Sequence, residues 1–265
     1  MSIIYRPTGR AAEYSHLAIN HYDGCGHRCK YCYVAGMPQW RDRDFFAAEP
    51  CAREDVIERL EQEAPAFAGT DERVLLCFTC DPYQPLDCSR HITREVIRIL
   101  KRWQIPFQVL TKGGTRAAGD FDLYREGDAF ATTMTRLHDT WSQYWEPFAA
   151  LPANRIKAIE LAKQLGIETW VSLEPVIDPG ESLRIIERTH DCVDLYKIGK
   201  MNHFASIIDW RWFGQEAIKT CNKFGKPYYI KDDLAQYLNG VPYENVDTRK
   251  IKRPVQGKLF SGVKQ

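Results

Sequence analysis

Three cysteines close together in the sequence are the residues most clearly suited to chemistry. Cys25, Cys29 and Cys32 stand in a C-x3-C-x2-C array, with basic and glycine residues between them. Three thiolates at this spacing, without a fourth cysteine in the same rhythm, fit a [4Fe–4S] cluster in which one iron has no protein ligand. Such an iron can hold a small molecule by its amino and carboxylate groups. A zinc site is the alternative, completed by one of three residues: His21, His27 or Cys51.

The chain around this array alternates short apolar runs with amphipathic segments, which is typical of repeated strand–helix units. Strands are predicted at residues 16–20, 74–79, 107–111, 129–134, 169–173 and 195–198, with a short one at 228–230. Helices are predicted at residues 53–67, 90–103, 153–165, 181–189 and 211–224. This order predicts a parallel sheet with outer helices, but it fits a doubly wound sheet and an incomplete barrel equally well.

Length and composition limit the kind of protein further. The chain has 265 residues, 44% of them hydrophobic, and a formal net charge of +1, which gives no general attraction to polyanions. No apolar run is long enough to span a membrane, and the N-terminus lacks the apolar core of a signal peptide. Nine cysteines without secretory context argue against a disulfide framework and predict a cytoplasmic protein.

The segment CGHRCKYCYV resembles the cluster motif of radical S-adenosylmethionine (SAM) enzymes, in the form found in the spore photoproduct lyase-like branch. The resemblance implies an α/β fold, a partial (β/α)6 TIM-like barrel, with the cluster loop after the first strand. It implies two cofactors, a [4Fe–4S] cluster and SAM, and a reducing electron donor of the flavodoxin or ferredoxin type. The implied reaction is reductive cleavage of SAM to a 5′-deoxyadenosyl radical, which abstracts hydrogen from a substrate. Functional residues are then expected at the carboxyl ends of the strands.

By this resemblance, cofactor contacts fall on residues at successive strand ends. Thr79 and Asp81 follow the second strand, where the family holds the amino group of the cofactor's methionine part. A plain Asp-Pro turn would also explain Asp81. Lys112 matches a lysine that approaches the cofactor carboxylate. Thr135, or Thr133 on the same strand face, is expected to contact the ribose.

Further residues near these strand ends are also candidates for the site, and some of them have an alternative structural role. Glu146 and Arg155 match the family pattern after the fourth strand, and a structural ion pair is their alternative role. Glu174 is expected to face the cavity and contact the cofactor, although the lyase pattern has a small residue there. Tyr31 is expected against the adenine. Tyr33 is expected in a hydrogen relay, with core packing as its alternative. The sixth strand places two lysines near the same end: Lys197 and Lys200.

The hydrogen-donor cysteine of the lyase has no direct counterpart here. It lies three residues before an aspartate, and the matching position, counted back from Asp81, is Phe78. Cys77 and Cys80 stand on either side of it. We predict that one of these two thiols has the catalytic role, and different chemistry is the alternative.

The substrate is predicted to be a nucleobase, in DNA, RNA or a nucleotide. Four aromatic residues after the fourth strand can stack on bases: Trp141, Tyr144, Trp145 and Phe148. A basic tail can contact phosphates: Arg249, Lys250, Lys252, Arg253, Lys258 and Lys264. There are three alternatives. The aromatics pack in the core and the tail only aids solubility; the substrate is a peptide, a protein or a small metabolite; or the protein is a non-catalytic iron–sulfur or zinc protein that binds nucleic acid. We divide the chain into a core domain with a short N-terminal extension, residues 1–240, and a basic C-terminal extension, residues 241–265.

Overall fold

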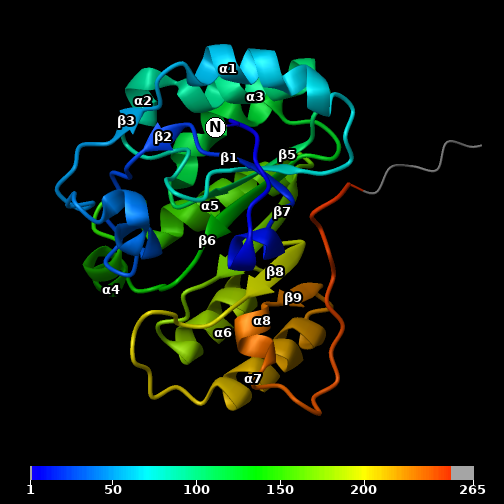
Figure 1. The fold of residues 1–265 in the computed structure, drawn as a ribbon. Coiled ribbons are helices and arrows are strands. Elements are labelled where there is room, and N and C mark those ends of the chain that lie inside the picture. The colour runs from blue at the N-terminus through cyan, green and yellow to red at the C-terminus, as the bar shows by residue number, and fades with distance from the viewer. Residues whose placement is uncertain (1, 252–265) are drawn as a thin grey trace, which may run out of the picture.

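The computed structural model describes residues 2–251 (Figure 1). Its main feature is a seven-stranded sheet in the order β1-β4-β5-β6-β7-β8-β9, in which every pairing is parallel. The strands are β1 (Leu17–Ile19), β4 (Val74–Leu76), β5 (Phe107–Thr111), β6 (Ala129–Thr133), β7 (Glu168–Leu173), β8 (Leu195–Ile198) and β9 (Tyr228–Ile230).

The strand order decides between the two architectures that the sequence pattern left open. A doubly wound sheet reverses its strand order at a switch point, whereas each strand here lies beside the next one in the chain. No pairing among residues 2–251 joins β1 to β9, so the barrel stays open. The predicted partial TIM-like barrel is therefore confirmed, with β9 as a seventh strand.

Helices cover the outer face of the sheet. The longer ones are α1 (Val56–Glu63), α3 (Ile92–Arg102), α5 (Pro152–Gln164), α6 (Pro179–Thr189) and α7 (Trp210–Lys223), and the short ones are α2 (Asp87–Arg90), α4 (Asp139–Trp145) and α8 (Asp232–Ala235). The described residues also form 3-10 helices, at Gly9–Glu13, Tyr33–Gly36, Pro38–Trp40, Ala64–Phe67 and Gly114–Leu123. In α3 the apolar positions 96, 97 and 100 are fully buried, as their spacing predicts. None of the helices in the described part of the chain is long and apolar enough to cross a membrane.

The N-terminal segment fills the concave side of the open barrel. The Tyr14 carbonyl accepts hydrogen bonds from Gln108 of β5 at 2.7 Å and from Lys197 of β8 at 3.2 Å. Glu13 accepts from the backbone N–H of Asp232, just after β9, at 2.7 Å. The Tyr14 ring packs on Trp170 inside the barrel. Residues 13–15, just before β1, therefore lie inside the barrel, although Arg6 and residues 8–10 of the same segment are exposed.

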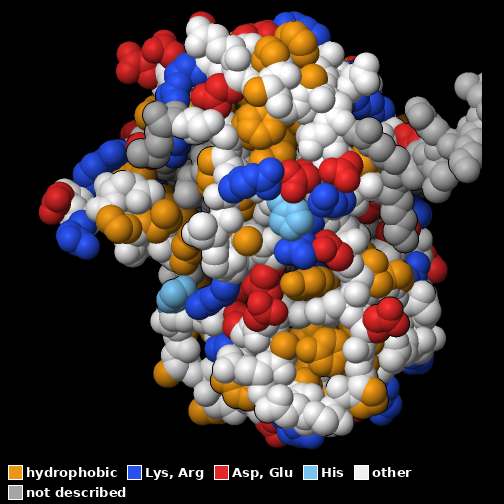
Figure 2. Space-filling model, turned by 45° about the vertical axis from the view of Figure 1, so that its right-hand side comes forward, with side chains coloured by type: hydrophobic (Ala, Val, Ile, Leu, Met, Phe, Trp, Pro, Cys, Tyr) orange, Lys and Arg blue, Asp and Glu red, His pale blue; other side chains and the backbone are white. Residues whose placement is uncertain are grey.

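Residues 249 and 250 of the C-terminal extension lie at the amino end of β4. The backbone N–H of Arg73, which precedes β4, donates to the Arg249 carbonyl at 3.0 Å, and Lys250 pairs with Asp71 at 3.5 Å. Residues 252–265, with the other basic residues of the predicted tail, lie outside the described residues. Acidic and basic side chains are interspersed over the face in Figure 2, in keeping with the small net charge.

Three elements differ from the sequence prediction. A two-stranded hairpin, β2 (Tyr22–Asp23) with β3 (Cys51–Ala52), encloses the cysteine segment. The aromatic segment after β6 forms α4 rather than a loop. The connection from β5 to β6 carries the 3-10 helix Gly114–Leu123, where no helix was predicted.

Candidate active site

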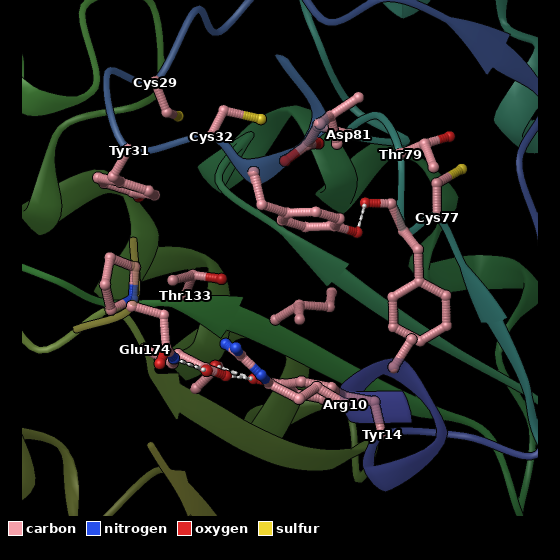
Figure 3. A pocket seen from close by; sticks show the side chains of 18 of the residues that line it. Arg10, Tyr14, Cys29, Tyr31, Cys32, Cys77, Thr79, Asp81, Thr133 and Glu174 are labelled. Carbon is pink, nitrogen blue, oxygen red and sulfur yellow. Dashed lines mark hydrogen bonds between the residues drawn. The ribbon is translucent and has the colours of Figure 1, made fainter. Parts of the chain in front are cut away.

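A cavity of about 470 Å³ opens at the carboxyl ends of the strands, and all three cysteines of the array line it (Figure 3). The loop that carries them is fixed by backbone hydrogen bonds. Lys30 N–H donates to the Trp145 carbonyl at 2.9 Å, and Gly26 N–H donates to the Gln84 side chain at 2.7 Å. Burial raises the pKa of Cys29 to about 12, so this thiol must lose a proton when it binds a metal.

The geometry does not support a mononuclear zinc site. Among the described residues, no three His, Cys, Asp or Glu side chains converge on a metal-ion position. The proposed fourth ligands have other surroundings. His27 accepts from Arg116 at 2.6 Å, His21 contacts Thr93, and Cys51 is exposed in β3. The three thiols instead line one wide cavity, as a larger cluster requires.

The carboxylate of Asp81 lines the cavity but is already occupied by protein donors. It accepts hydrogen bonds from Thr111 at 2.5 Å, Lys112 N–H at 2.7 Å and Tyr83 N–H at 2.9 Å, and Nδ1 of His27 lies 3.3 Å away. A carboxylate has about four acceptor positions. Asp81 therefore fixes the ends of β4 and β5, and the geometry does not favour the amino-group contact expected from it.

Three other predicted cofactor residues present free groups to the cavity. The hydroxyl of Thr79 is buried and has no hydrogen-bond partner among the described residues. Lys112 lines the cavity, and no carboxylate of the described chain lies within 4.0 Å of its ammonium group. Burial opposes its charge, but Cys29 and the nearby carboxylates raise the pKa of Lys112 overall. Thr133 lines the cavity at the end of β6. These groups suit the polar ends of an amino acid and a sugar.

A buried ion pair lies behind the residues that line this part of the cavity. Arg155 pairs with Glu146, and both side chains are almost fully buried. Glu146 also accepts from Thr135, at 3.0 Å, and from the Tyr31 hydroxyl. Thr135 is fully buried and does not line the cavity, so the ribose contact expected from it does not fit, and Thr133 is the better candidate. The Tyr31 ring still lines the cavity. Glu146 and Arg155 have the structural role that was their alternative.

Glu174 lies on the side of the cavity opposite Cys29 and Cys32 (Figure 3). It accepts from Lys231 and, at 2.7 Å, from the Tyr14 hydroxyl. The position of Gly199 explains how Glu174 fits, because a Cβ there would lie 2.8 Å from the Glu174 carboxyl carbon. Lys197 is buried and does not line the cavity, and this burial lowers the pKa of its ammonium group to about 7.

Cys77 lies in a hydrogen-bond chain that sequence reasoning missed. Thr93 donates its hydroxyl hydrogen to the Pro82 carbonyl at 2.5 Å, so it accepts from Nε2 of His21 at 2.9 Å. Nδ1 of His21 is then an acceptor, and the Cys77 sulfur lies 3.3 Å from it. Burial lowers the pKa of His21 to about 4, which keeps the ring neutral. The network therefore assigns a protonated Cys77 thiol that donates to His21. Only contacts across the fold could reveal this pairing.

Cys80 and Tyr33 lie in the same part of the cavity. Both line it, and the Tyr33 hydroxyl donates to the Phe78 carbonyl at 2.8 Å. Burial raises the pKa of Cys80 well above its usual value, so this thiol is also protonated. The two thiols thus differ in their partners, because only Cys77 among them contacts a histidine.

An exposed aromatic surface lies beside the cysteine loop. It consists of Trp141, Tyr144 and Phe148, which are about half exposed. A cation lies over each ring: Arg136 over Trp141 at 5.8 Å, Lys30 over Tyr144 at 3.3 Å and Arg28 over Phe148 at 5.6 Å. Trp145, the fourth predicted aromatic, is partly buried between Tyr31 and Phe204.

Comparison with known proteins agrees with this geometry. The family model of the radical SAM superfamily matches residues 19–193. An uncharacterized protein of Methanocaldococcus jannaschii is 22% identical over 214 residues, which cover 80% of this chain and 75% of the relative. The chain therefore belongs to the radical SAM superfamily.

Solved structures share the fold at low sequence identity. A variant of spore photoproduct lyase matches with a TM-score of 0.66 and 11% identity, over 85% of this chain and 80% of the other. SuiB of Streptococcus suis, bound to SAM, matches with a TM-score of 0.63 and 9% identity, over 86% of this chain but 53% of SuiB. The chain thus spans about half the length of SuiB. The cofactors of the family are a [4Fe–4S] cluster and SAM, and the three thiols, Thr79 and Lys112 fit them.

Proposed function

We propose that this radical SAM enzyme abstracts hydrogen from a nucleobase, in a nucleic acid or a nucleotide, to repair a lesion or modify the base. When bound, the cluster and SAM supply a 5′-deoxyadenosyl radical. The observation that carries the substrate class is the aromatic surface of Trp141, Tyr144 and Phe148, each ring with a cation over it. Exposed rings stack on bases, and Lys30 and Arg28 can contact phosphates, whereas Arg136 is already paired with Glu181 at 3.0 Å.

The roles of the chain's own residues follow from their contacts. Cys25, Cys29 and Cys32 hold the cluster, and Lys112, Thr79 and Thr133 orient SAM. After a bond of the lesion or base has broken in the substrate radical, Cys77 gives the hydrogen atom of its thiol to the carbon radical that results, and His21 holds that S–H bond in place. The thiyl radical left on Cys77 takes one electron from a flavodoxin- or ferredoxin-type donor and one proton. A reducing cytoplasm suits this chemistry, and the nine cysteines form no disulfide.

Anaerobic incubation with SAM, a reductant and single- or double-stranded oligonucleotides, some of them ultraviolet-damaged, tests the proposal. We expect 5′-deoxyadenosine together with a mass change in a base, or the return of damaged thymines, detected by mass spectrometry. SAM cleavage with every nucleotide substrate unchanged would favour a peptide, protein or small metabolite. Nucleic-acid binding without any SAM cleavage would point to the non-catalytic alternative.

A further inference from the structure

The end of the cavity away from the cysteines is formed by two segments outside the cysteine loop. Residues 8–14 of the N-terminal segment line it from one side, and the loop after β8 lines it from the other. Figure 3 shows Arg10, Tyr14 and Glu174 on the side opposite Cys29 and Cys32. The basic side chains in this lining are Arg10, Lys200, His203 and Lys231, and Glu174 is the one acid there among the described residues.

Two of these cations have N–H groups that make no hydrogen bond within the described residues. The guanidinium of Arg10 makes no hydrogen bond within residues 2–251, and its ion-pair partner, Asp233, lies 3.7 Å away. The ammonium group of Lys200 donates to the neighbouring Met201 carbonyl at 3.3 Å and lies over the Trp210 ring. A cavity wall with unused Arg and Lys donors suits an anionic group.

The acids near this end are held by other residues. Glu174 is paired with Lys231 and accepts from Tyr14. Asp233 lies behind the lining; its Oδ2 accepts from Asn202 at 2.5 Å and lies 3.7 Å from the Arg10 guanidinium. Glu13 also lies behind it, 3.7 Å from the Lys231 ammonium, and burial raises its pKa. Asp233 therefore neutralises Arg10 only in part, and no acid among residues 2–251 lies within 4.0 Å of the Lys200 ammonium, so both cations present charge to the cavity.

We propose that this end is an anion subsite that binds a phosphate group of the substrate. The inference rests on the proposed function, because it takes the substrate to be a nucleotide or nucleic acid. Arg10 can bind two phosphate oxygens through its planar fork, and Lys200 can add a third contact. The base and sugar then lie between this subsite and the residues assigned to SAM. The SAM carboxylate has its own free cation, Lys112, at the cysteine end.

The test compares ligands that differ only in the phosphate. Equilibrium dialysis of the cluster-loaded protein with SAM measures binding of the four deoxynucleoside 5′-monophosphates and of the matching nucleosides. We expect at least one monophosphate to bind tenfold or more tightly than its nucleoside, as one or two charge-assisted contacts require. In Arg10→Ala and in Lys200→Ala, the affinity for the monophosphate should fall close to the affinity for its nucleoside. Lys219→Ala, an exposed lysine of α7, should leave it unchanged. Iron content and circular dichroism verify that each variant is folded and loaded.

Three outcomes overturn the subsite. Equal binding of nucleoside and monophosphate removes it and leaves the nucleobase proposal standing. An unchanged ratio in Arg10→Ala, with a loss of SAM affinity instead, assigns this end to the cofactor. If no monophosphate binds, the subsite fails, and oligonucleotide product formation then shows separately whether the proposed function also fails.

Discussion

Lys112 is the residue through which cofactor binding can be separated from cluster binding. Its ammonium group faces the cavity without a carboxylate partner among the described residues, whereas the cluster ligands are the three thiols. We expect Lys112→Ala to weaken SAM binding about 10- to 100-fold, because it loses a charge-assisted contact of about 1.5–3 kcal/mol. Iron content should stay as in the wild type. Equilibrium binding of SAM to the reconstituted protein measures the effect, with Lys219→Ala as control. An unchanged affinity would mean that Lys112 does not face the cofactor.

The two thiols of the cavity can be distinguished by solvent deuterium. The hydrogen of a thiol exchanges with solvent, so in D2O a donor thiol delivers deuterium to the product. We expect a deuterium on the reacted carbon of the wild-type product, its loss in Cys77→Ala and its retention in Cys80→Ala. Only Cys77 has its S–H bond oriented by a histidine. Mass spectrometry of the base detects the difference. The reverse pattern in the two variants would assign the role to Cys80.

At the residue scale, the sequence predicted the groups that follow strand ends and missed those brought in from elsewhere. Thr79, Lys112 and Thr133 line the cavity because parallel strands deliver their next residues to one end of the barrel. Arg10 joins the same cavity from the N-terminal segment. No local pattern marks it, because its position depends on how that segment enters the open barrel. Lys231 was also missed, although it directly follows the predicted strand 228–230.

At the scale of the elements, the Glu146–Arg155 pair joins the end of α4 to α5, and the hydrogen bond from Tyr31 to Glu146 links both helices to the cysteine loop. We expect Arg155→Ala to destabilise the folded protein by about 3–5 kcal/mol, because Glu146 is left as an unpaired buried charge. Urea unfolding monitored by circular dichroism measures this loss. Iron retention should fall with it, because Glu146 also accepts from Tyr31, which lies between two of the cysteines.

The matched control removes both charges together. In Glu146→Leu with Arg155→Met, no charge is left without a partner, so we expect much of the lost stability to return. If the double variant is as unstable as Arg155→Ala, the cost comes from lost packing rather than from the unpaired charge.

Strands were easier to predict than the short elements near the site. The ranges 107–111 and 195–198 match β5 and β8, because each is a brief apolar run between polar turns. Helix α4, with the sequence DTWSQYW, has only 7 residues, about two turns, and no clear apolar face. Its position depends on tertiary contacts, such as the bond from Lys30 N–H to the Trp145 carbonyl.

At the scale of the whole molecule, the aromatic surface and the two described residues of the basic tail lie at different ends of the barrel. The aromatic surface lies beside the cysteine loop, at the carboxyl ends of the strands. The basic extension begins at the amino ends, where Arg249 pairs with Asp247 and Lys250 with Asp71. The aromatic surface is therefore better placed than Arg249 and Lys250 to guide a base into the cavity.

Oligonucleotide binding by variants of the aromatic surface tests this placement. We expect Trp141→Ala to weaken binding by about 1–3 kcal/mol, the value of one stacked base, and Lys30→Ala to reduce the salt dependence by about one phosphate contact. A chain that ends at residue 251 should keep the stacking contribution, because the aromatic surface is intact in it. Fluorescence anisotropy of a labelled single strand at several salt concentrations measures both quantities. If Trp141→Ala binds like the wild type while the shortened chain loses binding, the nucleic acid contacts the extension and not the surface beside the cysteines.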